Sequence, residues 1–243
     1  MGEEKRVAIM FIHGILGTPK HFDLFVPLVP SDWSVCNLQL KGHGKSVKDF
    51  SRASMTEWKQ QVKESLDELR KEHDQIVLVA HSMGTLFAIH EAVKNQVAEL
   101  FLLNVPLKIH ITARLIKTVW RVFTGNIKPE DKWSIAAKNA YGIEKDYHIL
   151  RYLGWIPRYL ELFLEIKRTK KLIQKLSVPT NVYLSLKDEM VSEKTYELLK
   201  DNNFVTVKML NKSGHFYYFS EDISLLNRDF KEMVKRVKSI RVQ

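Results

Sequence analysis

The sequence predicts an α/β fold in which a mostly parallel β-sheet is covered by helices on both faces. Short apolar runs alternate along the chain with longer segments whose apolar residues recur with helical period. Several of the short runs are apolar throughout, as expected of strands that are covered on both faces of a parallel sheet. A block at residues 107–176 breaks the alternation, and it predicts an insertion into this core.

The first part of the chain supplies four predicted strands, at residues 7–12, 33–40, 76–80 and 100–104. A loop containing glycine and proline follows the first strand and leads to a short helix at residues 21–28. Ser54 and Glu57 have the spacing of a capping box, which predicts a helix from there to about His73. A third helix is expected at residues 85–94.

Residues 107–176 contain no clear strand and are rich in aromatic residues. We predict a helical cap here, inserted into a core formed by residues 1–106 and 177–243. The cap should cover the carboxyl edge of the sheet, where α/β proteins bind their ligands. Most of its aromatic side chains are expected to form a small core of the cap, and a few to form an apolar wall for substrate. They are Trp120, Phe123, Trp133, Tyr141, Tyr147, Tyr152, Trp155, Tyr159 and Phe163.

After the cap the strand and helix alternation resumes. Strands are predicted at residues 182–186 and 205–210, with a helix near residues 192–200 between them. A final helix presents one apolar face that consists of Leu226, Phe230, Met233 and Val237.

The composition indicates one globular domain: the chain has 243 residues, of which 45% are hydrophobic and 27% charged. The single cysteine, Cys36, excludes an intramolecular disulfide and is expected to be a small buried core residue. The nine histidines show no metal-binding spacing, so neither a metal nor a cofactor is predicted. The apolar run at residues 7–12 is too short for a signal peptide, and no run suffices to span a membrane, so a cytoplasmic location is predicted.

The net charge of +10 raises the question of an anionic partner. Basic residues gather at 108–128, 158–175 and 231–241, but apolar residues are interleaved with them at helical spacing. This pattern is typical of solvated helix faces. We therefore predict a small-molecule substrate, no nucleic-acid partner and no stable membrane insertion. A weak contact with an anionic surface stays open, and so does the choice between a monomer and a homodimer.

The segment 80–84, Ala-His-Ser-Met-Gly, lies between a predicted strand and a predicted helix. A serine on so tight a turn projects its hydroxyl above the sheet, next to the N–H groups of the helix N-terminus. The residues two positions before and after the serine must be small to avoid clashes. Gly84 meets this requirement, and Ala80 nearly does. We predict Ser82 to be a nucleophile.

A serine nucleophile needs a base, and the base needs a carboxylate to orient it. His215 follows the last predicted strand and is the favoured base, with His43 as its rival. Asp188 follows the strand at residues 182–186 on the same edge and is the favoured acid, with Glu189 as the alternative. The chain order serine, aspartate, histidine is the one expected for this arrangement.

The oxyanion of an acyl-transfer intermediate needs backbone N–H donors. The residue after the nucleophile, Met83, should supply one of them. The loop after the first strand, His13-Gly14-Ile15-Leu16-Gly17, should supply the other, from Ile15 or alternatively Leu16. One such donor typically contributes roughly 3 kcal/mol to the transition state.

Taken together, these motifs resemble those of the α/β-hydrolases, in particular bacterial carboxylesterases and monoacylglycerol-lipase-like enzymes. The resemblance rests on His13-Gly14 with Gly17, residues 41–44, residues 80–84, Asp188 with Val191, and residues 213–215. It spans the chain from Val7 to about Met233 but is weak in the cap. It implies an α/β-hydrolase fold with a minimal core of six strands, lacking the two N-terminal strands of larger members.

The function predicted from these residues and this resemblance is hydrolysis of a carboxylic ester through an acyl-enzyme. The substrate is expected to carry a short-to-medium acyl chain or to resemble a monoacylglycerol. The same catalytic groups serve thioesterases, amidases, peptidases, carbon–carbon hydrolases and acyltransferases, which stay open as alternatives. A non-catalytic binding module with a basic cap is the alternative from another class.

Overall fold

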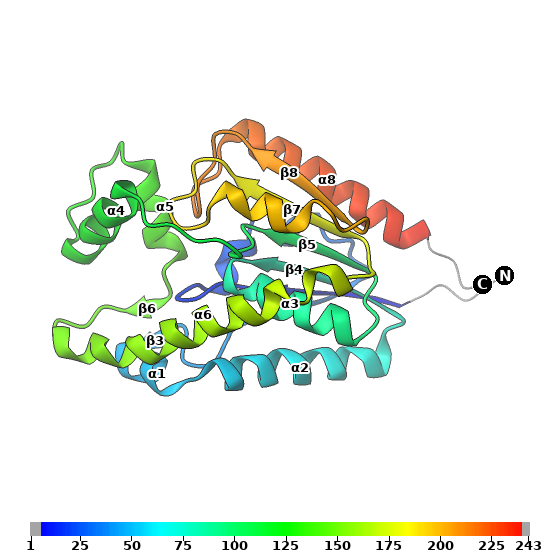
Figure 1. The fold of residues 1–243 in the computed structure, drawn as a ribbon, viewed down its shortest axis with the longest axis horizontal. Helices are drawn as coiled ribbons and strands as arrows, with labels where there is room; N and C mark the ends of the chain where they lie inside the picture. Colours follow the sequence, from blue (N-terminus) through cyan, green and yellow to red (C-terminus); the bar gives the residue numbers. More distant parts are fainter. Residues whose placement is uncertain (1–5, 240–243) are drawn as a thin grey trace.

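Six parallel strands form one sheet in the order β2-β1-β4-β5-β7-β8 (Figure 1). The structure is a computed structural model that describes residues 6–239. Every neighbouring pair of strands is parallel. The predicted α/β fold with its six-stranded core is therefore confirmed. The strands are β1 (Val7–Ile12), β2 (Ser34–Leu38), β4 (Gln75–His81), β5 (Glu99–Leu103), β7 (Thr180–Ser185) and β8 (Val205–Leu210).

The strand order reverses next to β1. The chain moves from β1 to one side to form β2, and then crosses to the other side of β1 to form β4. Such a reversal opens a crevice beyond the carboxyl ends of the two strands, because their connections leave in opposite directions. The loop after β1 and the turn after β4 therefore meet at one place.

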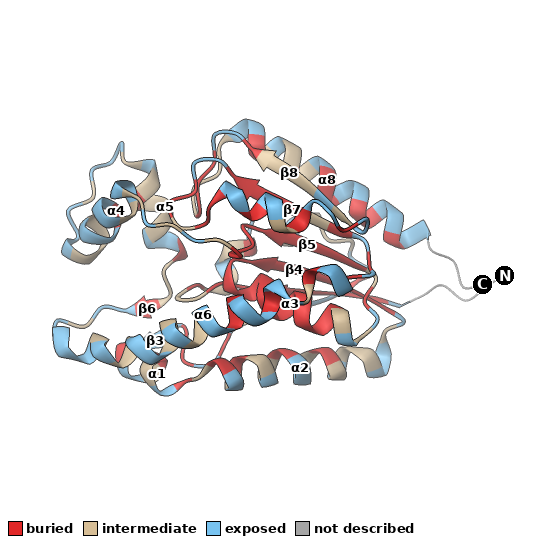
Figure 2. Ribbon diagram, viewed as in Figure 1, coloured by how far each residue is buried: buried red, intermediate tan, exposed pale blue. Residues whose placement is uncertain are grey.

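Helices cover both faces of the sheet, and the burial colouring shows the central strands as the buried layer, whereas the edge strand β8 is only partly buried (Figure 2). Successive residues of β1 point to opposite faces, with Met10 in the apolar cluster on one face and Phe11 in the cluster on the other. Helices α2 (Met55–Glu72) and α3 (Met83–Lys94) pack on the first face. The second face is covered by α8 (Ser220–Ser239), whose predicted apolar residues are all buried.

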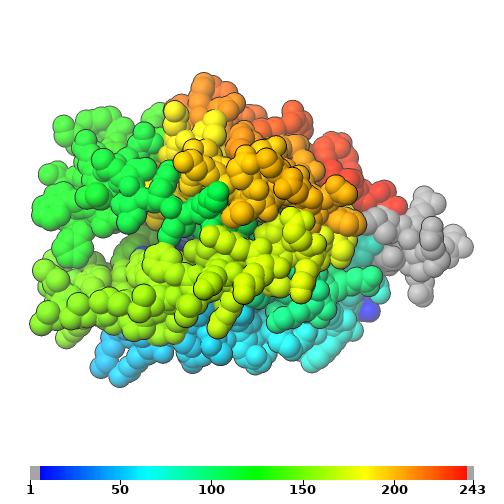
Figure 3. Space-filling view, viewed as in Figure 1, coloured from blue at the N-terminus to red at the C-terminus, as the bar shows by residue number. Residues whose placement is uncertain are grey.

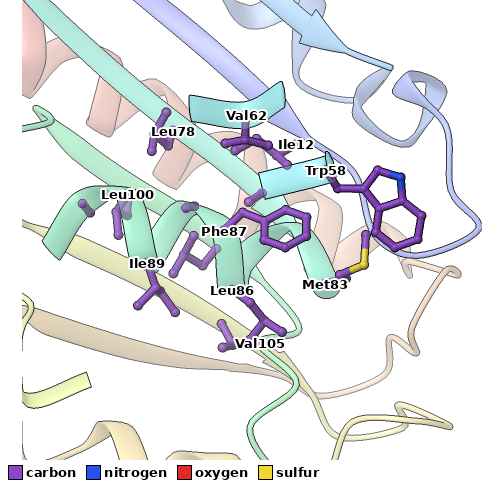
Figure 4. Close-up of a cluster of buried hydrophobic side chains, with 14 of the residues drawn as sticks. Ile12, Trp58, Val62, Leu78, Met83, Leu86, Phe87, Ile89, Leu100 and Val105 are labelled. Carbon is purple, nitrogen blue, oxygen red and sulfur yellow. The ribbon is translucent and has the colours of Figure 1, made fainter. Parts of the chain in front are cut away.

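The apolar cluster on the first face fixes α3 against the sheet. Leu86 and Phe87 of α3 lie among Leu78 and Leu100 of the strands (Figure 4). Trp58 of α2 is fully buried nearby, and its indole N–H donates to the carbonyl oxygen of Lys41 at 2.7 Å. Since α3 begins at the turn after β4, this packing sets the position of that turn.

The predicted start of α2 at Ser54 is confirmed, with one difference in its cap. The hydroxyl of Ser54 accepts the N–H of Glu57 at 3.2 Å, as predicted. The carboxylate of Glu57 accepts a hydrogen bond from the same hydroxyl at 3.1 Å and pairs with Lys41, so only one half of a capping box forms.

Several short elements differ from the prediction. Residues 21–28 form no continuous helix but two 3₁₀ turns, η1 (Pro19–Phe22) and η2 (Val26–Leu28), because Pro27 has no N–H to continue a helix. The helix expected near residues 192–200 is likewise short, as η5 (Glu193–Thr195) and α7 (Tyr196–Leu199). Cys36 is only half-buried, since β2 is an edge strand of the sheet.

A second small sheet was not predicted. It pairs β3 (Lys45–Ser46) with β6 (Ile143–Glu144) in parallel, and α1 (Val47–Arg52) follows β3 directly. Strands of two residues have no sequence period to detect. The prediction that residues 107–176 contain no strand was therefore wrong for β6.

Residues 107–176, which we call the cap segment, begin beyond the carboxyl ends of the strands, and α6 (Ile156–Lys170) within them runs back beside α3 (Figure 1). One arm of the segment consists of α4 (Ala113–Thr124) and α5 (Lys132–Ala140). The other arm consists of η3 (Ile149–Trp155) and α6. A hollow separates the two arms in the space-filling view (Figure 3).

The aromatic residues of the cap segment do not form the small core that was expected. None of the nine is fully buried, and Trp120, Tyr147 and Phe163 are exposed. A segment divided into two arms around a hollow has no closed interior in which to bury them. No helix within residues 6–239 is long and apolar enough to cross a membrane.

Candidate active site

Ser82 occupies the tight turn between β4 and α3. Its backbone has φ 51° and ψ −124°, a conformation that L-residues rarely adopt and that costs about 1–3 kcal/mol. Close packing below the turn explains the small neighbours. A Cβ on Gly84 would lie 2.1 Å from the carbonyl oxygen of Ile12, and one on Gly14 would lie 2.9 Å from the Cβ of Ser82.

The structure brings Ser82, His215 and Asp188 together at the carboxyl edge of the sheet. The hydroxyl oxygen of Ser82 lies 3.1 Å from Nε2 of His215, and Nδ1 of His215 lies 2.8 Å from Oδ2 of Asp188. All three residues are buried. The second carboxylate oxygen of Asp188 accepts the N–H groups of Met190 and Val191, each at 2.7 Å, which fixes the plane of the carboxylate.

Glu189, the alternative acid, points to a different atom of the base. Its carboxylate accepts the backbone N–H of His215 at 2.8 Å and makes no hydrogen bond with the imidazole ring. Burial raises the pKa of Glu189, and the hydrogen bond from His215 opposes that shift. Glu189 therefore positions the loop that carries His215.

His43, the alternative base, lies away from Ser82. Its ring packs against those of His13, Phe50 and Trp58, at centroid distances of 4.9, 5.1 and 5.0 Å. The ring of His43 is therefore packed in the loop after β2 and makes no hydrogen bond with Ser82.

Two residues that the sequence did not single out hold the loop of His215. Asp222, in the first turn of α8, accepts the backbone N–H groups of Lys212 and Ser213 and the hydroxyl of Ser213. Asn104 follows β5 with φ 52°; it accepts the N–H of Ser185 at 3.0 Å and donates to the carbonyl oxygen of Gly214 at 3.4 Å. No local pattern could have revealed them, because Asn104 binds residues 81 and 110 positions away and Asp222 binds a loop outside its own helix.

Neutral histidines surround the site. Nε2 of His13 accepts the N–H of Leu40 at 3.1 Å, so Nδ1 carries the proton and donates to the carbonyl oxygen of Gly14 at 2.9 Å. Burial lowers the pKa of His13 to about 4 and that of His43 to about 3. The ring of His81 lies between those of His21 and His215, at 3.8 and 4.7 Å, and burial holds its pKa well below the ordinary value.

These buried histidines predict a loss of stability in mild acid. Between about pH 6.5 and 4 the unfolded chain binds protons on His13 and His43 that the folded chain does not bind. The free energy of unfolding should therefore fall as the pH decreases from about 6.5, by ~1.4 kcal/mol per pH unit for each such histidine. Urea unfolding midpoints measured from pH 7 to 5 test this, since most carboxylates titrate at lower pH; a constant midpoint would contradict it.

The expected oxyanion donors lie on either side of Ser82. Met83 is the first residue of α3, and Ile15 lies in the loop after β1. Within residues 6–239, neither backbone N–H donates to a protein group. Leu16, the alternative donor, has φ 59°, and its carbonyl oxygen accepts the N–H of Gly142 from the cap segment at 2.7 Å.

The cap segment is bound to this site at two places. Near its start, the N–H of His110 donates to the carbonyl oxygen of Met190, and Nε2 of His110 donates to that of Asp188 at 2.9 Å. Near its middle, the N–H of Gly142 donates to the carbonyl oxygen of Leu16, as described above. Trp133 of α5 also packs over the loop of His215, where a Cβ on Gly214 would lie 2.0 Å from its ring.

Comparison with known proteins agrees with this architecture. The sequence matches the family described as serine aminopeptidase, S33, over residues 3–222. A thermostable monoacylglycerol lipase of Bacillus sp. (strain H-257) is 29% identical over 91 residues, which cover 37% of this chain and 36% of that protein. The match thus spans little more than a third of the length of that relative.

Two solved structures show the same fold over nearly the whole chain. One is from the metagenome-derived lipolytic enzymes LipS and LipT, with a TM-score of 0.72 and 16% identity over 96% of both chains. The other is the monoacylglycerol lipase of Paleococcus ferrophilus, with a TM-score of 0.68 and 14% identity over 97% of this chain and 96% of that one. At these identities the likeness establishes the fold. From the family match and this fold together, we conclude that the chain belongs to the S33 serine aminopeptidase family of the α/β-hydrolases.

Proposed function

We propose that the protein is a serine hydrolase that cleaves carboxylic esters with short-to-medium acyl chains or monoacylglycerol-like structure. The observation that carries the proposal is the buried chain of contacts from Ser82 through His215 to Asp188, at 3.1 and 2.8 Å. A nucleophile, a base and an orienting acid at these distances are the arrangement needed for acyl transfer.

In this proposal His215 holds a proton on Nδ1, facing Asp188, and accepts the hydroxyl proton of Ser82 at Nε2. The oxygen of Ser82 then bonds to the ester carbonyl carbon, and the N–H groups of Met83 and Ile15 stabilise the negative charge on the carbonyl oxygen. His215 gives its Nε2 proton to the departing alcohol as the carbon–oxygen bond breaks, which leaves an acyl-enzyme on Ser82.

Hydrolysis of the acyl-enzyme repeats these steps with water. His215 removes a proton from the water, whose oxygen attacks the acyl carbon. The ester bond to Ser82 breaks, Ser82 regains its proton from His215, and the acid leaves. No step requires a metal or cofactor.

Two features favour an ester with an apolar acyl chain. The arms of the cap segment flank a hollow and carry apolar side chains, which suit an acyl chain. The relatives named above are lipolytic enzymes or monoacylglycerol lipases. In this proposal residues 107–176 act as the cap over the core formed by residues 1–106 and 177–243.

A panel of p-nitrophenyl esters from acetate to laurate tests the proposal, together with a matched thioester and an aminoacyl p-nitroanilide. We expect the highest kcat/KM on a medium-chain ester and labelling of Ser82 by a fluorophosphonate probe. Preference for the thioester or the anilide would overturn the ester assignment. Folded protein that the probe does not label at Ser82 would overturn the nucleophile itself.

A further inference from the structure

We propose that the cap segment docks on membrane surfaces that contain anionic phospholipid, with the rims of its hollow facing the lipid. The proposal concerns the outer surface of the protein and does not depend on the reaction at Ser82. It rests on the positions of exposed apolar side chains and of unpaired lysines in residues 107–176.

The exposed apolar side chains are concentrated in the cap segment. Among residues 6–239, thirteen of the seventeen large apolar side chains that are exposed belong to it. Monomeric proteins rarely expose contiguous apolar surface, and where they do it commonly marks an interaction site. The thirteen are Ile109, Ile111, Ile116, Val119, Trp120, Tyr147, Ile149, Leu150, Leu153, Ile156, Leu160, Phe163 and Leu164.

These side chains form stripes on both arms. On α4, Ile116, Val119 and Trp120 are three and four residues apart and so share one face, with Trp120 67% exposed. On η3 and α6, Leu153, Ile156 and Leu160 repeat with similar spacing. The arms flank the hollow at the end of the molecule where the strands end (Figures 1 and 3).

The cap segment also carries almost all of the excess positive charge. It contains 15 lysines and arginines against six aspartates and glutamates, so it accounts for nine of the ten net charges of the chain. The rest of the chain, 173 residues, is nearly neutral. The excess charge is therefore concentrated in this segment.

Most of these cations have no carboxylate partner. Four arginines pair with four of the six carboxylates: Arg121 with Asp131, Arg151 with Asp146, Arg158 with Glu161 and Arg168 with Glu165. Within residues 6–239, none of the ten lysines of the cap segment forms an ion pair. They are Lys108, Lys117, Lys128, Lys132, Lys138, Lys145, Lys167, Lys170, Lys171 and Lys175.

A pocket of about 730 Å³ at the base of the cap segment gathers some of these lysines. Four lysines and one carboxylate line it beside apolar side chains that include Ile109 and Phe163: Lys108, Lys167, Lys170, Lys194 and Glu193. It contacts neither Ser82 nor His215. Lysines beside apolar walls again match the chemistry of an anionic lipid.

This combination favours an anionic bilayer over other occupants. Exposed isoleucine, leucine and tryptophan gain little from a nucleic-acid backbone, whereas they bury apolar area between lipid headgroups while lysines reach the phosphates. A second copy of the chain would bring two surfaces of the same strong charge together. Docking of this kind requires no membrane-spanning helix.

Vesicle flotation of the full-length chain tests the proposal. The Ser82→Ala variant is used as the parent protein, so that no lipid is hydrolysed during the measurement. We expect binding to vesicles of phosphatidylcholine with one third phosphatidylglycerol, little binding to pure phosphatidylcholine, and release when salt is raised, since salt screens surface charge. Binding should also shift the fluorescence of Trp120 to shorter wavelength, a shift that is absent after Trp120→Phe.

Two variants of the cap segment and one control separate the contributions of lysines and of apolar side chains to vesicle binding. Lys117→Gln/Lys128→Gln should weaken vesicle binding by on the order of tenfold. Ile116→Ser/Trp120→Ser should weaken it by at least as much. The control Lys231→Gln/Lys235→Gln removes the same charge from exposed positions on α8 and should bind like the parent. All three alter exposed residues, and thermal unfolding confirms that each remains folded.

Four outcomes would overturn the proposal. Equal weakening by the α8 control would show that net charge alone drives adsorption. Full binding by the Ile116→Ser/Trp120→Ser variant would show that the apolar stripe is not in contact with lipid. If the protein did not bind vesicles, and sedimentation showed a dimer that the Ile116→Ser/Trp120→Ser variant abolishes, the face would be assigned to a second copy of the chain. Tighter binding to an oligonucleotide than to vesicles would assign the face to nucleic acid.

Discussion

Replacing Ser82 with alanine is expected to lower kcat on ester substrates by on the order of 10⁵–10⁶-fold without unfolding the protein. The hydroxyl oxygen, 3.1 Å from Nε2 of His215, is the atom that we propose attacks the carbonyl carbon. The alanine side chain is smaller and requires no repacking. Steady-state kinetics on a medium-chain p-nitrophenyl ester, with thermal unfolding alongside, measures both effects.

A glycine at the same position gives a matched control for the backbone. Both variants lack the nucleophile, but only glycine adopts φ 51° without strain. Ser82→Gly should therefore be as inactive as Ser82→Ala yet unfold at a higher urea concentration, by about 1 kcal/mol in the free energy of unfolding. Turnover by either variant within a hundredfold of the parent would contradict the role of Ser82.

Replacing Asp188 with asparagine is expected to lower kcat by about 10⁴-fold, because it changes which nitrogen of His215 carries the proton. The backbone N–H groups of Met190 and Val191 would hold the amide oxygen of the asparagine, since they bind Oδ1 now. The amide NH₂ would then face Nδ1 of His215. Nδ1 would become an acceptor and Nε2 a donor, so that His215 could not take the proton of Ser82.

Glu189→Gln is the matched control for this variant. Its amide oxygen can still accept the backbone N–H of His215, which now binds the carboxylate at 2.8 Å. We expect kcat within about tenfold of the parent, since a neutral acceptor replaces a charged one. If Glu189→Gln lost as much activity as Asp188→Asn, the assignment of the acid would be wrong.

The sequence was informative wherever physical chemistry acts locally. Unbroken apolar runs located the central strands β1, β4 and β5, because a strand covered on both faces has few polar positions. The edge strands β2 and β8 contain polar residues and were located by the alternation of strands with helices. The spacing of Leu226, Phe230, Met233 and Val237 likewise identified the buried face of α8. Ser82 was recognisable because a tight turn between strand and helix requires Gly84, a requirement that the contact with Ile12 explains.

Features that depend on distant contacts were not predictable. Asn104 and Asp222 bind segments that are remote in sequence or lie in another element, and β3 pairs with β6 across about a hundred residues. The aromatic residues of the cap segment were expected to pack together because the segment is rich in them. Composition does not reveal that the segment is divided into two arms. The choice between Asp188 and Glu189 could not be made from the sequence, because both are carboxylates at neighbouring positions. The structure distinguishes them: Asp188 binds the imidazole of His215, and Glu189 binds its backbone N–H.

The two attachments of the cap segment have a consequence for how such a protein can diverge. His110 and Gly142 hold the segment to the loops of Asp188 and Leu16, and the thirty or so residues between them form α4 and α5. Insertions or deletions in this stretch can leave the contacts between Ser82, His215 and Asp188 in place only if the packing of Trp133 on Gly214 is kept. The rim of the hollow can therefore diverge in sequence more freely than the side chain that rests on the loop of His215.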